Sequence, residues 1–293
     1  MPPLQLAAFL LFTIVAFSSI EVVSHPIRDQ IDPMLLTFWR FHLGGLCLLI
    51  LGSAFGDFRR HVPPQRSDWL QLTLLGALNV ILSMGALAVA IKYASASTVA
   101  ILISSNPLAT NVFARLLLAE PLDTRRWIAL LCGVTGVVLI CLRPTGTIDT
   151  AFGIGCGLAA MLTFGLYTVV SKPLVARLGS LPVAAYSFGL ACLIYFPFLW
   201  VHLPTVWPAN ELWGRILYLG IVVSGLAYVT FYRALAVLPA GRASLLFFCK
   251  PPTAGLLAWL VLGETPGQTV LIGAGLVMFG LLIDRRPSSE SRR

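Results

Sequence analysis

The chain has 293 residues, of which 58% are hydrophobic and 11% are charged, and its mean hydropathy is +0.88. A soluble domain is about half apolar and about a quarter charged, so this composition argues against a soluble enzyme and predicts lipid-facing surface along the chain. The formal charge is +8, but no block of like charge carries interleaved aromatic residues, which argues against a nucleic-acid-binding surface.

Apolar runs bounded by Pro, Gly and charged residues predict an all-α integral membrane protein with ten transmembrane helices. A bilayer core of roughly 30 Å needs about 20 apolar residues per helix. The predicted segments lie near residues 4–25, 33–53, 69–91, 96–118, 126–142, 152–172, 182–202, 213–235, 241–262 and 267–283. The first has no Lys or Arg before it and no cleavage pattern of small residues, so we interpret it as a retained helix and not a signal peptide.

The positions of Lys and Arg predict the orientation in the membrane. With the N-terminus in the cytoplasm, 13 of these residues lie in cytoplasmic loops and 4 lie outside. Cytoplasmic loops carry the excess of positive charge in membrane proteins. The even number of segments agrees with this bias, and both termini are predicted to be cytoplasmic.

The sequence also contains an internal repeat. Residues 22–27 (VVSHPI) match residues 169–174 (VVSKPL) at an offset of 147, and a run of later positions, among them Pro107 with Pro251 and Glu120 with Glu264, matches at an offset of 144. Each half holds five segments, so the second copy must cross the membrane in the opposite sense. Two inverted five-helix repeats, 1–147 and 148–293, are typical of secondary transporters with a midplane site between the repeats, although some channels and membrane enzymes also arose by duplication.

Several segments carry a resemblance to a known family. They are residues 161–172 (MLTFGLYTVVSK), 228–235 (YVTFYRAL), 251–264 (PPTAGLLAWLVLGE), its first-half counterpart 107–120, and Arg40. The chain resembles the ten-helix EamA-type branch of the drug/metabolite transporter superfamily. The resemblance implies an exporter in a prokaryotic cytoplasmic membrane, with helices 1–4 and 6–9 around the cavity and helices 5 and 10 peripheral. The chain departs from many relatives in having Phe17-Ser18-Ser19 in place of Trp-Gly, and in Lys250.

Four ionisable residues inside the segments are candidates for a substrate-binding site. Such a group costs a few kcal/mol at bilayer depth, so it should face the bundle interior or water. Lys250 lies near the midplane with no acidic residue at its own depth, and we interpret it as a substrate or coupling residue. Glu21 and Arg40 share the outer half of the membrane, with His42 on a different helix face from Arg40. A structural ion pair between Lys250 and Glu21 is the alternative.

Two proline-interrupted helices point to the same region. Pro107 follows Asn106 in the fourth segment, and Pro251 and Pro252 follow Lys250 at the corresponding place in the ninth. Prolines remove backbone donors, and paired interrupted helices indicate a transporter site.

Further polar residues complete the predicted site. Asn79, Tyr167 and Tyr228 lie on polar helix faces, for which close helix packing is the alternative. Glu120 and Glu264 end the fourth and ninth segments, where a carboxylate opposes the helix dipole, and we predict structural or gating contacts for them.

The predicted function is transport of a small organic solute by alternating access, without a cofactor or metal. The sequence has no GxxxxGK[ST] or HExxH motif, and the GIGCG run at 153–157 follows no strand. Lys250 would bind the anionic end of an amino acid or other amphoteric solute, and Glu21, with Arg40 and His42, its cationic end or a coupling proton. Alternatives are a broad exporter of organic cations, and a membrane-embedded enzyme or sensor without net flux. The expected partners are the solute and the bilayer, in a monomer or homodimer.

Overall fold

The structure, a computed structural model, describes residues 2–24, 27, 30–54, 58, 63–94, 96–141, 150–203, 206–253, 256 and 268–284. These residues form helices and short connections, and no strand occurs among them. The all-α prediction is therefore confirmed for the described part of the chain.

The first half of the chain begins with two single helices, α1 (Pro3–Ser24) and α2 (Pro33–Ala54). The next column consists of α4 (Arg66–Gly76), the π-helix η2 (Ala77–Ser83) and α5 (Met84–Tyr93). It is followed by α6 (Ala96–Ser104), α7 (Asn106–Leu118) and α8 (Thr124–Cys141).

The second half begins with two long helices, α9 (Ala151–Leu178) and α10 (Ser180–His202). The next column consists of the 3-10 turn η3 (Asn210–Leu212), α11 (Trp213–Leu217), the π-helix η4 (Tyr218–Leu226) and α12 (Ala227–Val237). It is followed by α13 (Ala240–Ser244), the 3-10 segment η5 (Leu245–Cys249) and α15 (Gln268–Asp284).

Among the described residues, seven helical stretches are long and apolar enough to cross a membrane. They are Pro3–Ile20, Pro33–Ala54, Arg66–Tyr93, Ile101–Leu118, Ala151–Leu178, Ser180–His202 and Asn210–Val237. Large apolar side chains such as Leu116, Leu193 and Val201 are more than 70% exposed. Lipid tails are the natural solvent for such a surface. The count of ten spans, their inverted arrangement and the orientation of the termini stay predictions.

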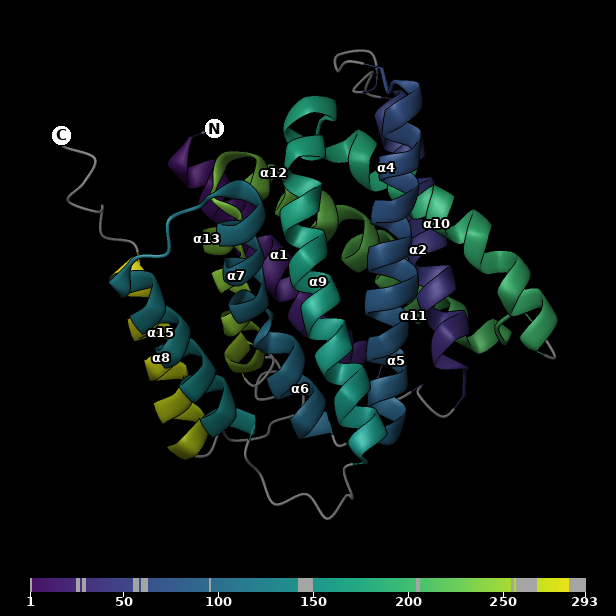
Figure 1. Cartoon of the computed structure of the whole chain (residues 1–293). Helices are drawn as coiled ribbons and strands as arrows, with labels where there is room; N and C mark the ends of the chain where they lie inside the picture. The colour runs from purple at the N-terminus through teal and green to yellow at the C-terminus, as the bar shows by residue number, and fades with distance from the viewer. Residues whose placement is uncertain are drawn as a thin grey trace.

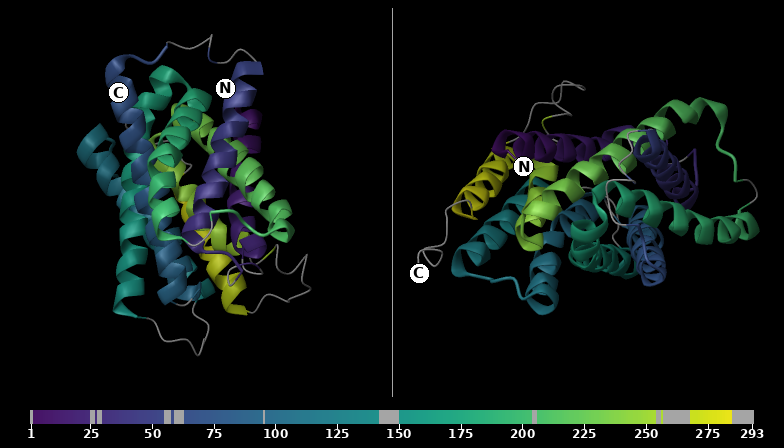
Figure 2. Two further views of the ribbon diagram at one scale, coloured as in Figure 1. Left: turned by 90° about the vertical axis from the view of Figure 1, so that its right-hand side faces the viewer. Right: turned by 90° about the horizontal axis from the view of Figure 1, so that it is seen from above.

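The helices pack as a bundle in which α8 and α15 pair at one edge and α10 lies at the opposite edge (Figure 1). The long helices run side by side (Figure 2). Their buried apolar residues form one large cluster, and a second, smaller cluster joins α8, η5 and α15. Glycines allow the closest approaches. A Cβ added at Gly76 would lie 2.0 Å from the Ser187 carbonyl oxygen, and one added at Gly44 would lie 2.9 Å from the Gly220 carbonyl oxygen. Small residues at such crossings are typical of membrane helices.

Candidate functional site

Four of the predicted site residues meet in the middle of the bundle, each from a different helix. Tyr228 of α12 lies beside the Asn79 amide of η2 and within electrostatic range of the Arg40 guanidinium of α2. Its ring centroid is 6.5 Å from that of Tyr167 in α9. All four side chains are buried, with exposed fractions between 0% and 8%. Buried polar groups at this depth of a membrane protein mark a functional site by default.

Aromatic rings surround the Tyr228 phenol. Phe188 of α10, Phe17 of α1 and Phe41 of α2 pack against it in edge-to-face geometry, with centroid distances of 5.0, 5.3 and 5.6 Å. Edge-to-face pairs are the arrangement that aromatic quadrupoles prefer. The polar groups therefore sit inside an aromatic wall to which both halves of the chain contribute.

Phe17, Ser18 and Ser19 of α1 make side-chain contacts with the second half of the chain. Phe17 stacks on Phe247 of η5 at 5.8 Å, and the Ser18 hydroxyl donates to the Lys250 carbonyl oxygen at 3.2 Å. Ser19 shares a hydrogen bond of 2.8 Å with the Tyr218 hydroxyl. Lys250, which is 9% exposed, is thus held next to the aromatic wall through its backbone.

Both proline-containing helices are interrupted at corresponding positions. The first breaks at Ser105, between α6 and α7, and the Asn106 side-chain nitrogen donates to the Ile103 carbonyl at 2.8 Å. That carbonyl is the one that the missing N–H of Pro107 leaves without its helical donor. In the ninth segment, η5 is a 3-10 helix.

The backbone N–H of Lys250 donates to the Phe247 carbonyl, which Pro251 leaves without a donor. The carbonyls of Ile103 and Phe247 are therefore satisfied locally and do not stay open for a ligand. Pro251 is buried and Pro252 half-buried.

One described site residue, His42, is not brought to this cluster. It is exposed on α2, where it stacks on Phe38 at 5.4 Å and packs edge-on against Trp39. Glu21 belongs to α1, but its side chain lies outside the described residues, as does Glu264.

Glu120 links the two halves at one end of the bundle. Its Oε1 accepts a hydrogen bond from Lys172 Nζ of α9 at 2.8 Å and from the Ala240 N–H at 2.7 Å, and its Oε2 accepts one from the Gly241 N–H at 3.1 Å. The carboxylate therefore caps the N-terminus of α13. Burial acts to raise the pKa of Glu120, but these hydrogen bonds outweigh it and hold the pKa below its ordinary value.

Sequence reasoning missed two further contacts. The Tyr167 hydroxyl shares a hydrogen bond with that of Tyr232, one helical turn after Tyr228. Asp68, 1% exposed at the start of α4, forms a bidentate ion pair with Arg177 at the end of α9. The spacing of Tyr228 and Tyr232, four residues apart in YVTFYRAL, predicts that both lie on the same helix face. Nothing in the sequence predicts that Asp68 pairs with Arg177.

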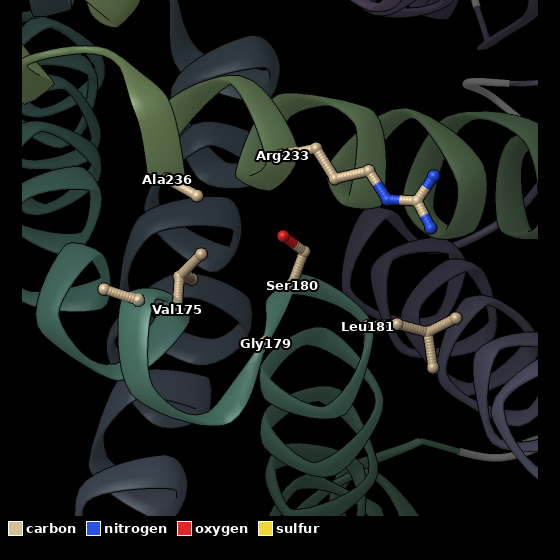
Figure 3. A pocket seen from close by; sticks show the side chains of 7 residues that line it. Val175, Gly179, Ser180, Leu181, Arg233 and Ala236 are labelled. Carbon is tan, nitrogen blue, oxygen red and sulfur yellow. The ribbon is translucent and has the colours of Figure 1, made fainter. Parts of the chain in front are cut away.

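A pocket of about 360 Å³ lies away from this cluster, where α9 meets α10 (Figure 3). Arg233 and Ala236 of α12 line it, with Val175, Ala176, Gly179, Ser180 and Leu181 from the α9–α10 junction. It contains none of the predicted site residues.

Comparisons with known proteins agree with the fold. The model of the EamA-like transporter family matches residues 5–142 and again residues 151–283. An uncharacterized transporter of Clostridium kluyveri is 28% identical, over 94% of this chain and 91% of the relative. A probable terminal-alkyne amino-acid exporter of Streptantibioticus cattleyicolor is 25% identical, over 88% of this chain and 86% of the relative. One crystal structure superposes with a TM-score of 0.82 at 20% identity, over 97% of each chain.

Proposed function

Because the chain belongs to the EamA-like transporter family, and is a multi-pass membrane protein, we propose that it is a secondary-active carrier that exports a small amphoteric solute, most simply an amino acid. The observation that carries the proposal is the buried cluster of Arg40, Asn79, Tyr167 and Tyr228, contributed by both halves in the middle of an apolar bundle. A relative named as an amino-acid exporter supports this solute class.

In this proposal the carrier is built from two inverted five-helix repeats, 1–147 and 148–293, with ten spans and both termini in the cytoplasm. The family model matches each half separately, which supports the duplication. The interrupted helices at Ser105 and η5 occupy corresponding places in the two halves, which supports a site between them.

We assign the anionic end of the solute to Lys250, and the cationic end or a coupling proton to Glu21 with Arg40. His42, which is exposed on α2, has no part in this assignment. The Lys250 carbonyl oxygen accepts a hydrogen bond from Ser18, so the first half of the chain contacts the ninth segment directly beside the assigned lysine. The amide of Asn106 lies at the matching break of the first half, and its buried Oδ1 accepts no hydrogen bond from the described residues.

Glu120 has a gating role in this proposal, as do the helix breaks at Pro107, Pro251 and Pro252, and Glu264 at the opposite face. In this proposal, opening the cytoplasmic side requires α13 to move away from α7. The Glu120 contacts with Ala240 and Gly241 join these helices, together with the hydrogen bond that Asn111 donates to the Gly241 carbonyl at 3.1 Å. The Glu120 hydrogen bonds to α13 must therefore break each time the carrier opens to the cytoplasm.

Counterflow in sealed proteoliposomes tests the proposal. Vesicles are loaded with unlabelled amino acids or small carboxylates, singly, and given a trace of labelled leucine, glutamate or lysine outside. Wild type and the exposed-lysine control Lys92→Ala are expected to accumulate label, and Lys250→Ala is not. Normal accumulation and half-saturation in Lys250→Ala would remove the assigned role of Lys250. No accumulation by wild type would refute the amino-acid reading and favour organic cations.

A further inference from the structure

Among the described residues, each half of the chain contains one π-helix, and the two lie at corresponding positions. In η2 the Met84 N–H bonds the Asn79 carbonyl, and in η4 the Ala227 N–H bonds the Val222 carbonyl, each five residues back. Shifted by the repeat offset of 144, residues 77–83 fall on 221–227, which overlaps η4. π-Helical segments are rare and occur frequently at functional sites.

Each π-helix carries a fully buried polar side chain that lacks a hydrogen-bond partner among the described residues. In η4 this is Ser224, and in η2 it is Asn79, whose amide makes no hydrogen bond of ordinary geometry although it lies close to the Tyr228 hydroxyl. The contrast with Ser83, also in η2 and also fully buried, is informative, because its hydroxyl donates to the Ala160 carbonyl at 3.2 Å. Leaving a buried polar group unsatisfied costs about 1–3 kcal/mol, so such groups need a reason to persist.

Asn79 lies next to Tyr228, and Ser224 lies about one helical turn before it in the chain. The Asn79 amide is beside the Tyr228 hydroxyl. Ser224 precedes Tyr228 by four residues, and α2 contacts both, with Gly44 against the Ser224 backbone and the Phe41 ring 5.6 Å from the Tyr228 ring. The first-half group therefore lies beside the residue at the centre of the aromatic wall, and the second-half group lies about one helical turn from that residue along the chain.

We propose that Asn79 and Ser224 bind one oxygen atom of the transported solute from opposite halves of the carrier, beside the Tyr228 hydroxyl. An amide nitrogen and a hydroxyl both donate hydrogen bonds, so together they fit an acceptor oxygen. This inference rests on the proposed carrier function and adds a residue, Ser224, to its site. In this proposal the role of the two π-helices is to orient the Asn79 and Ser224 side chains toward the solute.

Thiol accessibility tests the inference without knowledge of the solute. Single cysteines replace Asn79, Ser224 and the matched control Ser83 in a chain whose six native cysteines have been removed. Sealed vesicles are exposed to a small, membrane-impermeant methanethiosulfonate. Because a solute-binding side chain must meet water when the carrier opens, the thiols at 79 and 224 are expected to react at least tenfold faster than the thiol at 83. Equal rates at 224 and 83 would overturn the inference.

Thermal unfolding of alanine variants gives a second readout. Ser224→Ala is expected to keep or raise the melting temperature, because the hydroxyl bonds nothing in the protein, whereas Ser83→Ala is expected to lower it. An equal loss in both variants would mean that Ser224 has a structural partner and would also overturn the inference. Rapid labelling at 79 and 224 without counterflow of any solute would instead refute transport and leave the two residues in a water-filled site.

Discussion

Substitution of Glu120 by Gln perturbs the bond set that joins α7, α9 and α13. The carboxylate accepts three hydrogen bonds at 2.7–3.1 Å, one from the Lys172 ammonium and two from the first N–H groups of α13. Hydrogen bonds to charged groups contribute about 1.5–3 kcal/mol each, and an N-cap about 1 kcal/mol. Gln keeps one acceptor oxygen but loses the charge, so we expect the closed arrangement to lose about 2 kcal/mol, or about 30-fold in population.

The shift in population is measurable as a distance distribution. Nitroxide labels are placed at two exposed positions, Leu116 on α7 and Val237 at the end of α12. Val237 is close in the chain to α13, which begins at Ala240. In proteoliposomes at pH 7, Glu120→Gln is expected to move a large share of the molecules to longer distances. Glu211→Gln, which alters an exposed carboxylate on η3, is the control and is expected to leave the distribution unchanged.

The pH dependence of the same measurement refines the test. Since the pKa of Glu120 is held below its ordinary value of 4.5, the contact is at full strength above that value and weakens as the pH falls through the lowered pKa. The wild-type distances should therefore lengthen only below about pH 4.5, and those of Glu120→Gln should show no such step. Identical distributions for wild type and Glu120→Gln at pH 7 would refute the gating role.

Two further predictions concern packing and are read by thermal or denaturant unfolding in detergent. Tyr232→Phe leaves the buried Tyr167 hydroxyl without this partner and is expected to lower the unfolding free energy by about 1–2 kcal/mol, with much of the loss recovered when Tyr167→Phe is added. A double variant whose loss is simply additive would show that the hydroxyls do not interact. Gly76→Ala drives a methyl group into the Ser187 carbonyl and is expected to destabilise the protein, whereas Gly85→Ala has open space and should stabilise it by about 0.5–1 kcal/mol through helix propensity. Equal effects of the two alanines would contradict the close α4–α10 contact.

The sequence predicted the helical fold and much of the central cluster because both follow from local rules. Apolar runs of membrane length predict the helices. A polar residue such as Asn79 inside one of them is costly in contact with lipid, so it is expected to face the interior of the bundle. The helix breaks were predictable from Pro107 and Pro251, because proline lacks a donor. The fate of the carbonyl that each proline leaves without a donor was not predictable, because it depends on which neighbouring group donates a hydrogen bond to it.

What the sequence could not supply were contacts and backbone states that depend on three-dimensional packing. The Glu120 cap on α13 joins residues 120 positions apart. The carboxylate is unfavourable at the C-terminal end of its own helix, and it becomes favourable only because the N-terminus of α13 packs against it. His42 is a different case. Its spacing predicted a helix face different from that of Arg40, and the structure shows it exposed and stacked on Phe38, which the spacing did not reveal. Neither π-helix has a composition that marks it.

Two pairs of polar residues in this bundle differ in how their hydrogen bonds are satisfied. Toward the helix ends, Glu120 and Asp68 have charged partners and backbone donors, as expected of groups that stabilise one arrangement of helices. In the middle of the bundle, Asn79 and Ser224 are fully buried, more deeply than Glu120, yet neither makes a hydrogen bond of ordinary geometry with the described residues. Stability alone favours replacing such groups with apolar ones of the same shape. Their burial in the middle of the bundle is therefore better explained by a bound solute than by folding, whereas the paired groups at the ends are suited to hold the helices closed while that solute is enclosed.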